Sequence, residues 1–500
     1  MTATPAAPSP HKPTPLVTVT VRGLLWTYAS LAVTRGGVLL TTIVLARLLT
    51  PTDFGVVAFA IVAIDLLSIG KDVGMGAALI QHQDESSAAF DTAFTLNLLM
   101  ACVLTVVCLA LAPQIATWFD EPAVGPLLRW MSLTFLLDAG GFVHLVHLRR
   151  TLAFRRKLSS DVIRTIVKVT VSVTAALAGL GAGALVAGNL AASCAASVAA
   201  WYLVPWRPRL RIDRDRARAL LRYGGRLAGS DALGVIEDRS EQLIVGWMLG
   251  PAALGTYTVA GRAPALIANN LLWVTTGVLF PAYVTLREHP ERLREALLDT
   301  VKFSSMLYVP ITLGLALTAG PLVSGVLGSQ WESGAIVLQL LALSALPSAL
   351  TFHMGDVLKS TGRTDLMLRI TVLELVVLLP AMAVGAGFGL AGVASARLLA
   401  SLVAALARAV VSLRLVQAPR GAFAAALAPS AIAGTALTVA VALCHLLPIR
   451  SPLVRLAVMT MVGALVYGAV LWSRERQTIL WLARRVSKRR SVRVGTEQER

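Results

Sequence analysis

Residues 98–112 read Leu-Leu-Met-Ala-Cys-Val-Leu-Thr-Val-Val-Cys-Leu-Ala-Leu-Ala, a run without a charged side chain. Such a run suits a helix in the hydrocarbon core of a bilayer, and similar apolar runs recur along the whole chain. We expect about fourteen helices, each long enough to cross roughly 30 Å at about 1.5 Å per residue. Their expected limits are about 23–48, 54–80, 88–113, 123–148, 159–180, 183–205, 219–249, 253–283, 297–327, 334–358, 365–387, 390–414, 422–447 and 452–473.

The composition agrees with a membrane protein and excludes an array of soluble domains. Hydrophobic residues make up 56% of the 500 residues and charged residues 14%, against about 25% charged in soluble proteins. The 45 Lys and Arg minus the 27 Asp and Glu give a net charge of +18. Since these basic residues lie in short gaps between apolar runs, they indicate topology and not nucleic-acid binding.

Basic residues mark one side of the membrane. They gather in the loops at 149–157 and 206–218 and in the tail after residue 473, whereas the loops expected on the opposite side are short and nearly free of Lys and Arg. The positive-inside rule then places both termini in the cytoplasm and requires an even number of spans in the cytoplasmic membrane. The Thr-, Pro- and Ala-rich residues 1–20 are expected to form a disordered cytosolic tail.

A weak internal repeat indicates two similar halves. Leu49-Thr-Pro-Thr-Asp-Phe-Gly55 and Leu249-Gly-Pro-Ala-Ala-Leu-Gly255 share Leu, Pro and Gly at a shift of two hundred residues. The shift spans six expected helices, so the copies share one orientation, as in transporters built from parallel repeats. We therefore expect an all-α protein with two six-helix lobes, 21–205 and 219–417, joined by a basic linker at 206–218. Helices 13 and 14 at 418–473 and a basic cytosolic tail at 474–500 follow.

Several charges fall inside the expected spans. A central Arg or Asp costs roughly 2.5–3.5 kcal/mol on insertion scales, so each should face water or another charge. The positions three and four residues from Arg239 hold no acid, so its partner must come from another helix or from an anionic ligand. The sequence leaves open whether these groups line a cavity or pair between helices. The candidates are the arginines Arg35, Arg239, Arg262 and Arg397 and the acids Asp65, Glu241 and Glu374.

Motifs for enzymatic chemistry are missing from the sequence. There is no GxxxxGK[ST] sequence, so ATP hydrolysis is not expected. His144 and His147 share a helix face, but no third ligand is evident nearby. The expected protein is not an enzyme, and beyond a coupling proton or sodium ion no cofactor or metal is expected.

Short motifs spread over residues 20–417 resemble those of a known family. They are Leu45–Gly55, Asp72–Gln81, Arg150–Phe154, Glu241–Gly246, Leu249–Gly250 with Leu254–Tyr257, Leu279–Pro281 and Leu327–Trp331. Their order and spacing are similar to those of the bacterial polysaccharide transporters, the Wzx-like lipid-linked oligosaccharide flippases. These belong to the multidrug/oligosaccharidyl-lipid/polysaccharide superfamily, and the resemblance implies the MATE-like arrangement of its exporters.

The resemblance implies a flippase that moves undecaprenyl-diphosphate-linked oligosaccharide across the cytoplasmic membrane by alternating access. Its partners would be this lipid-linked oligosaccharide, the bilayer and proteins of polymer synthesis. We hypothesise that Arg35, Arg239, Arg262 and Arg397 form a cationic cavity for the diphosphate, and that Asp65, Glu241 and Glu374 serve ion coupling. The alternatives are a cation-coupled multidrug exporter of the same superfamily and a scaffold without transport.

Overall fold

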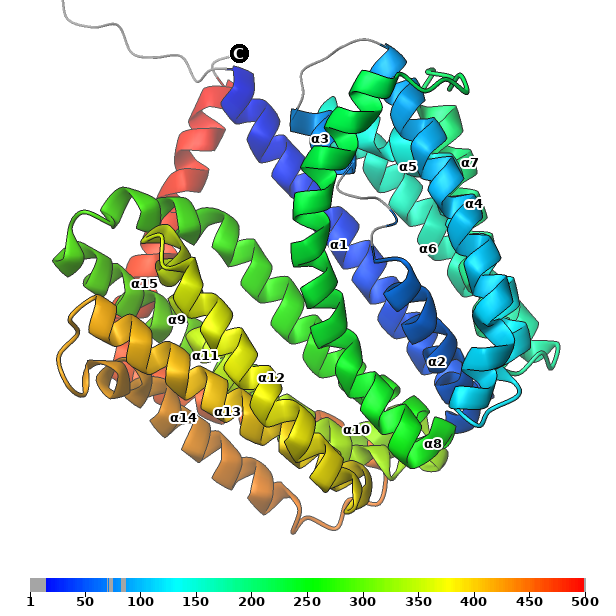
Figure 1. The fold of residues 1–500 in the computed structure, drawn as a ribbon. Coiled ribbons are helices and arrows are strands. Elements are labelled where there is room, and N and C mark those ends of the chain that lie inside the picture. Colours follow the sequence, from blue (N-terminus) through cyan, green and yellow to red (C-terminus); the bar gives the residue numbers. More distant parts are fainter. Residues whose placement is uncertain (1–14, 70, 72–74, 82–86, 499–500) are drawn as a thin grey trace, which may run out of the picture. The chain divides into compact units, whose positions relative to one another are not determined.

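The computed structural model describes residues 15–69, 71, 75–81 and 87–498. Residues 1–14 of the expected disordered tail lie outside this range, and for residues 15–20 the expectation is wrong, because they form the start of the first helix. The described residues form α-helices with one π and one 3-10 turn, and they contain no strand (Figure 1). The α-helices are α1 (Pro15–Leu48), α2 (Pro51–Leu67), α3 (Met75–Gln81), α4 (Ser87–Trp118), α5 (Val124–Arg150), α6 (Phe154–Leu177), α7 (Ala182–Leu203), α8 (Arg214–Leu286), α9 (Pro290–Leu317), α10 (Ala319–Leu322), α11 (Gly334–Ser360), α12 (Thr364–Ala386), α13 (Gly389–Leu415), α14 (Ala422–Cys444) and α15 (Pro452–Gln498).

Most expected helices are present, and several differ from the expectation. The helix expected at 297–327 begins at Pro290 and ends at Leu317, and α10 and a π turn follow it; the helix expected at 452–473 runs on to Gln498. The helix expected at 54–80 is wrong as one element, because α2 ends at Leu67 and α3 begins only at Met75. The sequence that follows Leu67 contains Gly70, Lys71, Asp72 and Gly74, residue types that disfavour an apolar helix. The helix expected at 159–180 starts earlier, at Phe154, so its first turns include the basic loop residues.

Ten helical stretches among the described residues are long and apolar enough to cross a membrane. The spans expected at 23–48, 54–80 and 159–180 are not among them, and within α8 one stretch, Gly234–Leu266, qualifies. The helix α2 has only 17 residues, and charged side chains crowd the first half of α6. The expected number of about fourteen spans therefore remains a prediction.

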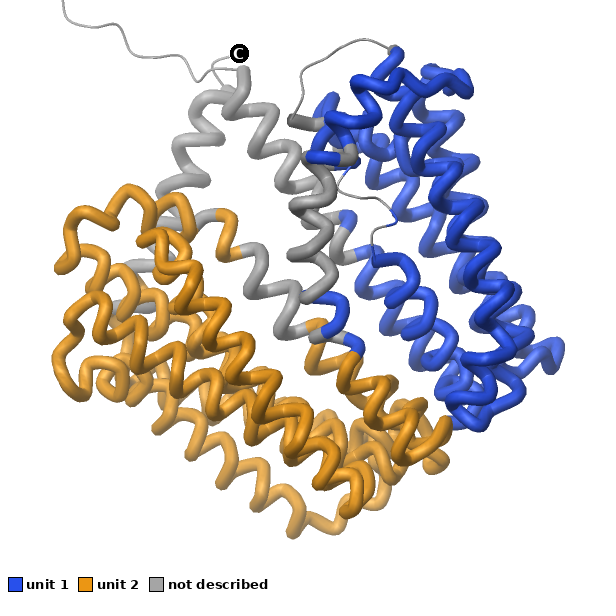
Figure 2. The backbone as a smooth tube through the Cα atoms, viewed as in Figure 1, with its two compact units in different colours: residues 1–239 blue, residues 240–500 orange. Residues whose placement is uncertain are grey.

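The chain has two compact units, residues 1–239 and 240–500, and their boundary falls inside α8 (Figure 2). In the first unit α4 packs against α5, α5 against α7, and α6 against α7. In the second unit α9 packs against α11, α11 against α13, and α12 against α13. These are the same pairings in the same order along the chain, so the two units repeat one helix arrangement. The helices α14 and α15 pack against each other and against α9.

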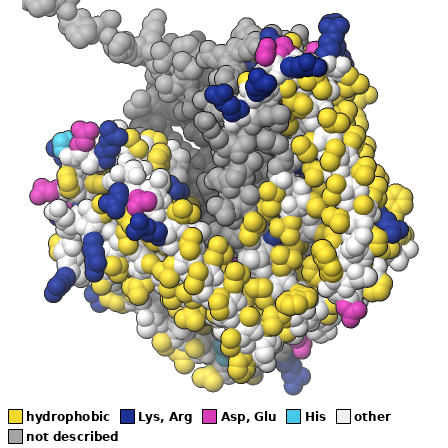
Figure 3. Space-filling model, viewed as in Figure 1, with side chains coloured by type: hydrophobic (Ala, Val, Ile, Leu, Met, Phe, Trp, Pro, Cys, Tyr) yellow, Lys and Arg dark blue, Asp and Glu magenta, His cyan; other side chains and the backbone are white. Residues whose placement is uncertain are grey.

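Small residues allow the repeated pairs to approach closely. In the α6–α7 pair, a Cβ on Gly188 would overlap the hydroxyl of Ser172, and in the α12–α13 pair a Cβ on Gly392 would overlap the carbonyl oxygen of Gly385. Such contacts between small residues stabilise helix pairs in lipid. Because lipid tails are as apolar as a Leu side chain, the hydrophobic effect does not bring helices together there. The outer faces are correspondingly apolar, and hydrophobic side chains spread over the visible surface of each unit (Figure 3).

The turn at Leu49–Gly55, which is the first copy of the internal repeat, caps two helices. Thr50 and Asp53 make a capping box at the start of α2, with the Thr50 hydroxyl accepting from the Asp53 amide at 3.2 Å. One carboxylate oxygen of Asp53 accepts the Thr50 amide at 2.9 Å, and the other accepts the Ala182 amide at 3.0 Å, at the start of α7. One side chain therefore satisfies orphan amides of two helix ends.

Replacing Asp53 with Ala is expected to lower the free energy of unfolding by about 1–2 kcal/mol, because both helix starts lose an acceptor. Thermal unfolding of the purified protein in detergent measures the change. Thr52→Ala, at the exposed neighbouring position, is the matched control. Equal melting temperatures for the two variants would contradict the double cap.

Candidate functional site

The predicted residue Arg239 forms an ion pair in the first unit. It lies on α8, and its Nη2 is 2.6 Å from Oδ2 of Asp65, near the end of α2. The sequence required a partner from another helix or from a ligand, and α2 supplies it. The Arg239 and Asp65 side chains keep 28% and 33% of their exposure, so an incoming anion can reach the pair.

The predicted residue Arg397 is the centre of a charged network in the second unit. Its Nη1 lies 2.9 Å from Oε1 of Glu241 on α8 and 3.5 Å from Oε1 of Glu374 on α12. Arg408, three turns further along α13, reaches the other oxygen of Glu374 at 3.9 Å. The hydroxyl of Tyr257 donates to Oε2 of Glu241 at 2.8 Å. One arginine therefore joins α8, α12 and α13.

The Tyr257–Glu241 bond depends on a sharp reversal of the chain within α8. Sixteen residues of continuous helix would separate the two positions by about 24 Å. Gly250 breaks the helix with φ 83° and ψ −179°, and Pro251 begins the next segment. A side chain at that φ would be strained, so glycine is favoured here. The turn expected at residues 249–255 is thus confirmed, and it brings Tyr257 back to Glu241.

The network in the second unit contains two arginines and two glutamates, so its formal charges cancel. Neutral groups of this kind lower the cost of placing charge among apolar helices. Glu374 keeps only 7% of its side-chain exposure and Arg397 keeps 25%. Arg397 is therefore the more accessible member of this pair, and an incoming anion can contact it. To bind there, it must replace a carboxylate.

The other two predicted arginines lie apart from these ion pairs. Arg35 is exposed on α1, and no described residue forms an ion pair with it. Arg262 is half-buried in the part of α8 that follows Gly250. The convergence of all four arginines on one cavity therefore remains a prediction.

Two members of the network were not among the predicted site residues. Arg408 shares α13 with Arg397 at a separation of eleven residues, close to three helical turns, which puts both on one face. Tyr257 belongs to the Leu254–Tyr257 motif, but its role requires the hairpin at Gly250. For Arg408, the signal available in the sequence was its helical spacing from Arg397.

The histidines singled out in the sequence lie among aromatic rings. His144 is buried and stacks on Trp201 with ring centroids 4.9 Å apart. His147 lies 5.7 Å from the ring of Phe90. Within the described part of the chain, no group of three or more His, Cys, Asp or Glu side chains is placed to hold a metal ion.

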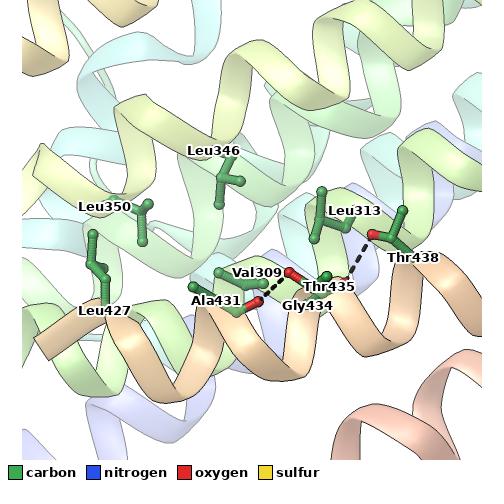
Figure 4. A pocket seen from close by; sticks show the side chains of 9 residues that line it. All are labelled: Val309, Leu313, Leu346, Leu350, Leu427, Ala431, Gly434, Thr435 and Thr438. Atoms are coloured by element: carbon green, nitrogen blue, oxygen red, sulfur yellow. Dashed lines mark hydrogen bonds between the residues drawn. The ribbon is translucent and has the colours of Figure 1, made fainter. Parts of the chain in front are cut away.

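An apolar groove of about 300 Å³ runs along α14 in the second unit (Figure 4). The two hydroxyls in its wall, Thr435 and Thr438, donate to carbonyls of their own helix, so they are satisfied locally. The groove is suited to a hydrocarbon chain, whether of a bilayer lipid or of a polyprenyl carrier. It is lined by Val309, Leu313, Leu346, Leu350, Leu427, Ala431, Gly434, Thr435 and Thr438.

Solved structures define the class to which this fold belongs. The chain is similar to the lipid II flippase MurJ in an inward closed conformation, with a TM-score of 0.72 and 13% identity over 92% of this chain and 100% of that chain. It is also similar to an inward-facing multidrug resistance MATE family transporter of the MOP superfamily, with a TM-score of 0.63 and 17% identity over 78% and 95%. The protein is an all-α, multi-pass membrane protein with the fold of these transporters.

Sequence comparison gives the family. The chain belongs to the polysaccharide biosynthesis protein family, whose model matches residues 44–337. It is 28% identical to the succinoglycan biosynthesis transport protein ExoT of Rhizobium meliloti (strain 1021), over 66% of this chain and 67% of that protein. The family resemblance seen in the sequence is therefore confirmed. The protein is a multi-pass membrane protein of this polysaccharide biosynthesis family.

Proposed function

We propose that the protein is a flippase for undecaprenyl-diphosphate-linked oligosaccharide. It moves this lipid from the cytoplasmic to the outer leaflet of the cytoplasmic membrane by alternating access, for the synthesis of cell-surface polysaccharide. Both termini lie in the cytoplasm. Family membership and the similarity to a succinoglycan transport protein support the substrate class. The observation that carries the proposal is that Arg239 and Arg397 are each held by acids from other helices and remain partly exposed.

The diphosphate binds by replacing carboxylates on these arginines. A guanidinium makes paired hydrogen bonds to phosphate oxygens and keeps its charge in a medium of low dielectric constant. A diphosphate offers more oxygens and more charge than the single carboxylate oxygen that Arg239 contacts on Asp65. Each arginine is already oriented for the exchange, and the cost of leaving a carboxylate without its arginine is offset when that carboxylate takes up a cation.

The displaced acids take up a compensating cation. When the substrate pairs with Arg239, Asp65 loses its cation, and when the substrate pairs with Arg397, Glu241 and Glu374 lose theirs. An uncompensated carboxylate in a membrane protein takes up a proton or a sodium ion. Arg35 and Arg262 add positive charge for the diphosphate or for acidic sugars.

The multidrug exporter is the alternative to be excluded. Such a protein needs acids that are free to attract a cationic drug. The acids Asp65, Glu241 and Glu374 all pair with arginines instead. The likeness to a MATE transporter concerns the fold and leaves the substrate open.

A flipping assay with the purified protein tests the proposal. Liposomes receive a fluorescent polyprenyl-diphosphate oligosaccharide in one leaflet, and a membrane-impermeant quencher reports its appearance in the other. We expect flipping at least about tenfold faster than in protein-free liposomes, which is ~1.4 kcal/mol, and no protein-dependent ethidium transport. Ethidium transport without lipid flipping would replace the flippase with the exporter, and inactivity in both assays would support the scaffold.

A further inference from the structure

A second group of polar side chains, of which His353 and Asp356 are buried, lies in the second unit apart from the arginine network. His353 and Asp356 lie three residues apart on α11, with Nδ1 of the imidazole 3.0 Å from Oδ2 of the carboxylate. Their side chains are 3% and 2% exposed. Thr275 on α8 lies 3.0 Å from Nε2 of His353, and Thr276 donates to Oδ2 of Asp356 at 3.1 Å. Four side chains from two helices thus form one connected cluster.

The cluster lies inside a candidate membrane span, Gly334–Ser360. Ionisable side chains in such a position are costly and are rarely kept without a function. Two threonines would be enough for a polar contact between α8 and α11. The buried imidazole and carboxylate therefore call for an explanation beyond packing.

The cluster carries a carboxylate without a permanent cation. Within the described residues, the salt bridges of Asp356 include no Lys or Arg, and the histidine is its one basic partner. From α8, Tyr283 approaches, and its hydroxyl donates to Thr300 of α9. From α13, Ser412 donates to the backbone of Met354. On α11 itself, Lys359 follows Asp356 by three residues and is exposed. On the neighbouring helices, Arg408 and Arg397 pair with Glu374, and Lys302 pairs with Glu475.

Adding one proton to this cluster removes its net charge. With a neutral imidazole, Nδ1–H donates to Asp356, Nε2 accepts from Thr275, and the cluster carries the charge of the carboxylate. The added proton goes to Nε2, and a neutral imidazolium–carboxylate pair results. The cluster thus has one place for an added proton, at Nε2 of His353.

The added proton also changes the contact between two helices. Once Nε2 is protonated it donates, so the Thr275 hydroxyl can no longer donate to it and must accept instead. The hydrogen bond between α8 and α11 therefore reverses its direction. The contact between these helices therefore differs between the two protonation states.

We propose that His353, Asp356 and Thr275 form a proton-binding site that couples transport to the proton gradient. The inference rests on the proposed flippase function and names its coupling ion and a site for that ion. This site is separate from the acids that pair with Arg239 and Arg397. The proton binds at Nε2 of His353, Asp356 supplies the compensating charge, and Thr275 transmits the change to α8.

The transport test uses the reconstituted full-length protein with an imposed pH gradient. The quantity measured is the ratio of the flipping rate with the gradient to the rate without it, and an internal pH dye reports proton movement. We expect a ratio of at least about tenfold for the parent protein and close to one for His353→Gln and Asp356→Asn. His144→Gln, which removes another buried histidine, is the matched control and should keep the parent ratio. A His353→Gln ratio equal to that of the parent would overturn the proposal.

Proton binding is measured separately from transport, so that the two proposals can fail independently. The protein has 7 histidines, and nuclear magnetic resonance of ¹³C-labelled imidazoles in detergent can follow each of them. The signal that His353→Gln removes should shift with pH, and Asp356→Asn should change that shift. A His353 signal that stays constant wherever the protein remains folded would overturn the proton site, whatever the flipping assay shows. A titrating signal in a protein that does not flip lipid would refute the flippase and keep the site.

Discussion

Replacing Arg239 with Gln is expected to lower polysaccharide export at least about tenfold, or ~1.4 kcal/mol. Two effects combine in this loss. The substrate loses a guanidinium, and Asp65 loses the partner that lies 2.6 Å away. The partly exposed pair contributes roughly 1–3 kcal/mol to stability, between the values for surface and buried pairs. Export is measured as cell-surface polymer in a strain that lacks the native gene, normalised to the amount of protein in the membrane.

A charge swap separates the two effects. Arg239→Asp combined with Asp65→Arg keeps the ion pair between α8 and α2 but moves the guanidinium from α8 to α2. We expect the double variant to regain the melting temperature of the parent protein and to remain defective in export. Arg369→Gln, an exposed arginine on α12, controls for the loss of one positive charge. Full export by the swapped variant would mean that the pair serves the fold alone.

The helices were the most predictable part of this protein. The limits of α11, α12, α13 and α14 lie within about three residues of those expected, because apolar length and flanking turn residues decide where a helix leaves the bilayer. The turn at Gly250 was equally readable from its Gly-Pro sequence. The end of α2 at Leu67 was not, because hydropathy averaged over 54–80 hides the glycines and charged residues at 70–74.

The candidate site was predictable in its members and not in its pairings. Insertion cost selects intramembrane charges one by one, which found Arg239, Asp65 and Arg397. Which acid meets which arginine depends on how distant helices pack, and one sequence carries no such information. His353 and Asp356 had a local signal, a spacing of three residues in an apolar helix. Their importance comes from Thr275 and Thr276, almost eighty residues away in the chain, which only the fold brings near.

Replacing Arg397 with Ala is expected to have the largest effect on folding. Glu374, which keeps 7% of its exposure, would retain only the more distant Arg408 at 3.9 Å, and Glu241 would retain only the Tyr257 hydroxyl. Removing one partner of a buried ion pair costs about 3–5 kcal/mol, because the remaining charge lacks compensation. We expect a protein that accumulates poorly in the membrane, as measured by immunoblot and by fluorescence-detected size-exclusion chromatography.

Neutralising Glu241 together with Arg397 restores folding without restoring the anion site. Arg397→Gln combined with Glu241→Gln keeps the network neutral, because Glu374 remains paired with Arg408, and the new amides can hydrogen-bond to each other and to Tyr257. This double variant should accumulate like the parent protein and still flip lipid at least about tenfold more slowly. Arg397→Lys is the intermediate case, since one ammonium keeps the charge but not the planar fork that spans Glu241 and Glu374. Normal flipping by the double variant would show that Arg397 holds α8, α12 and α13 together and takes no part in binding the diphosphate.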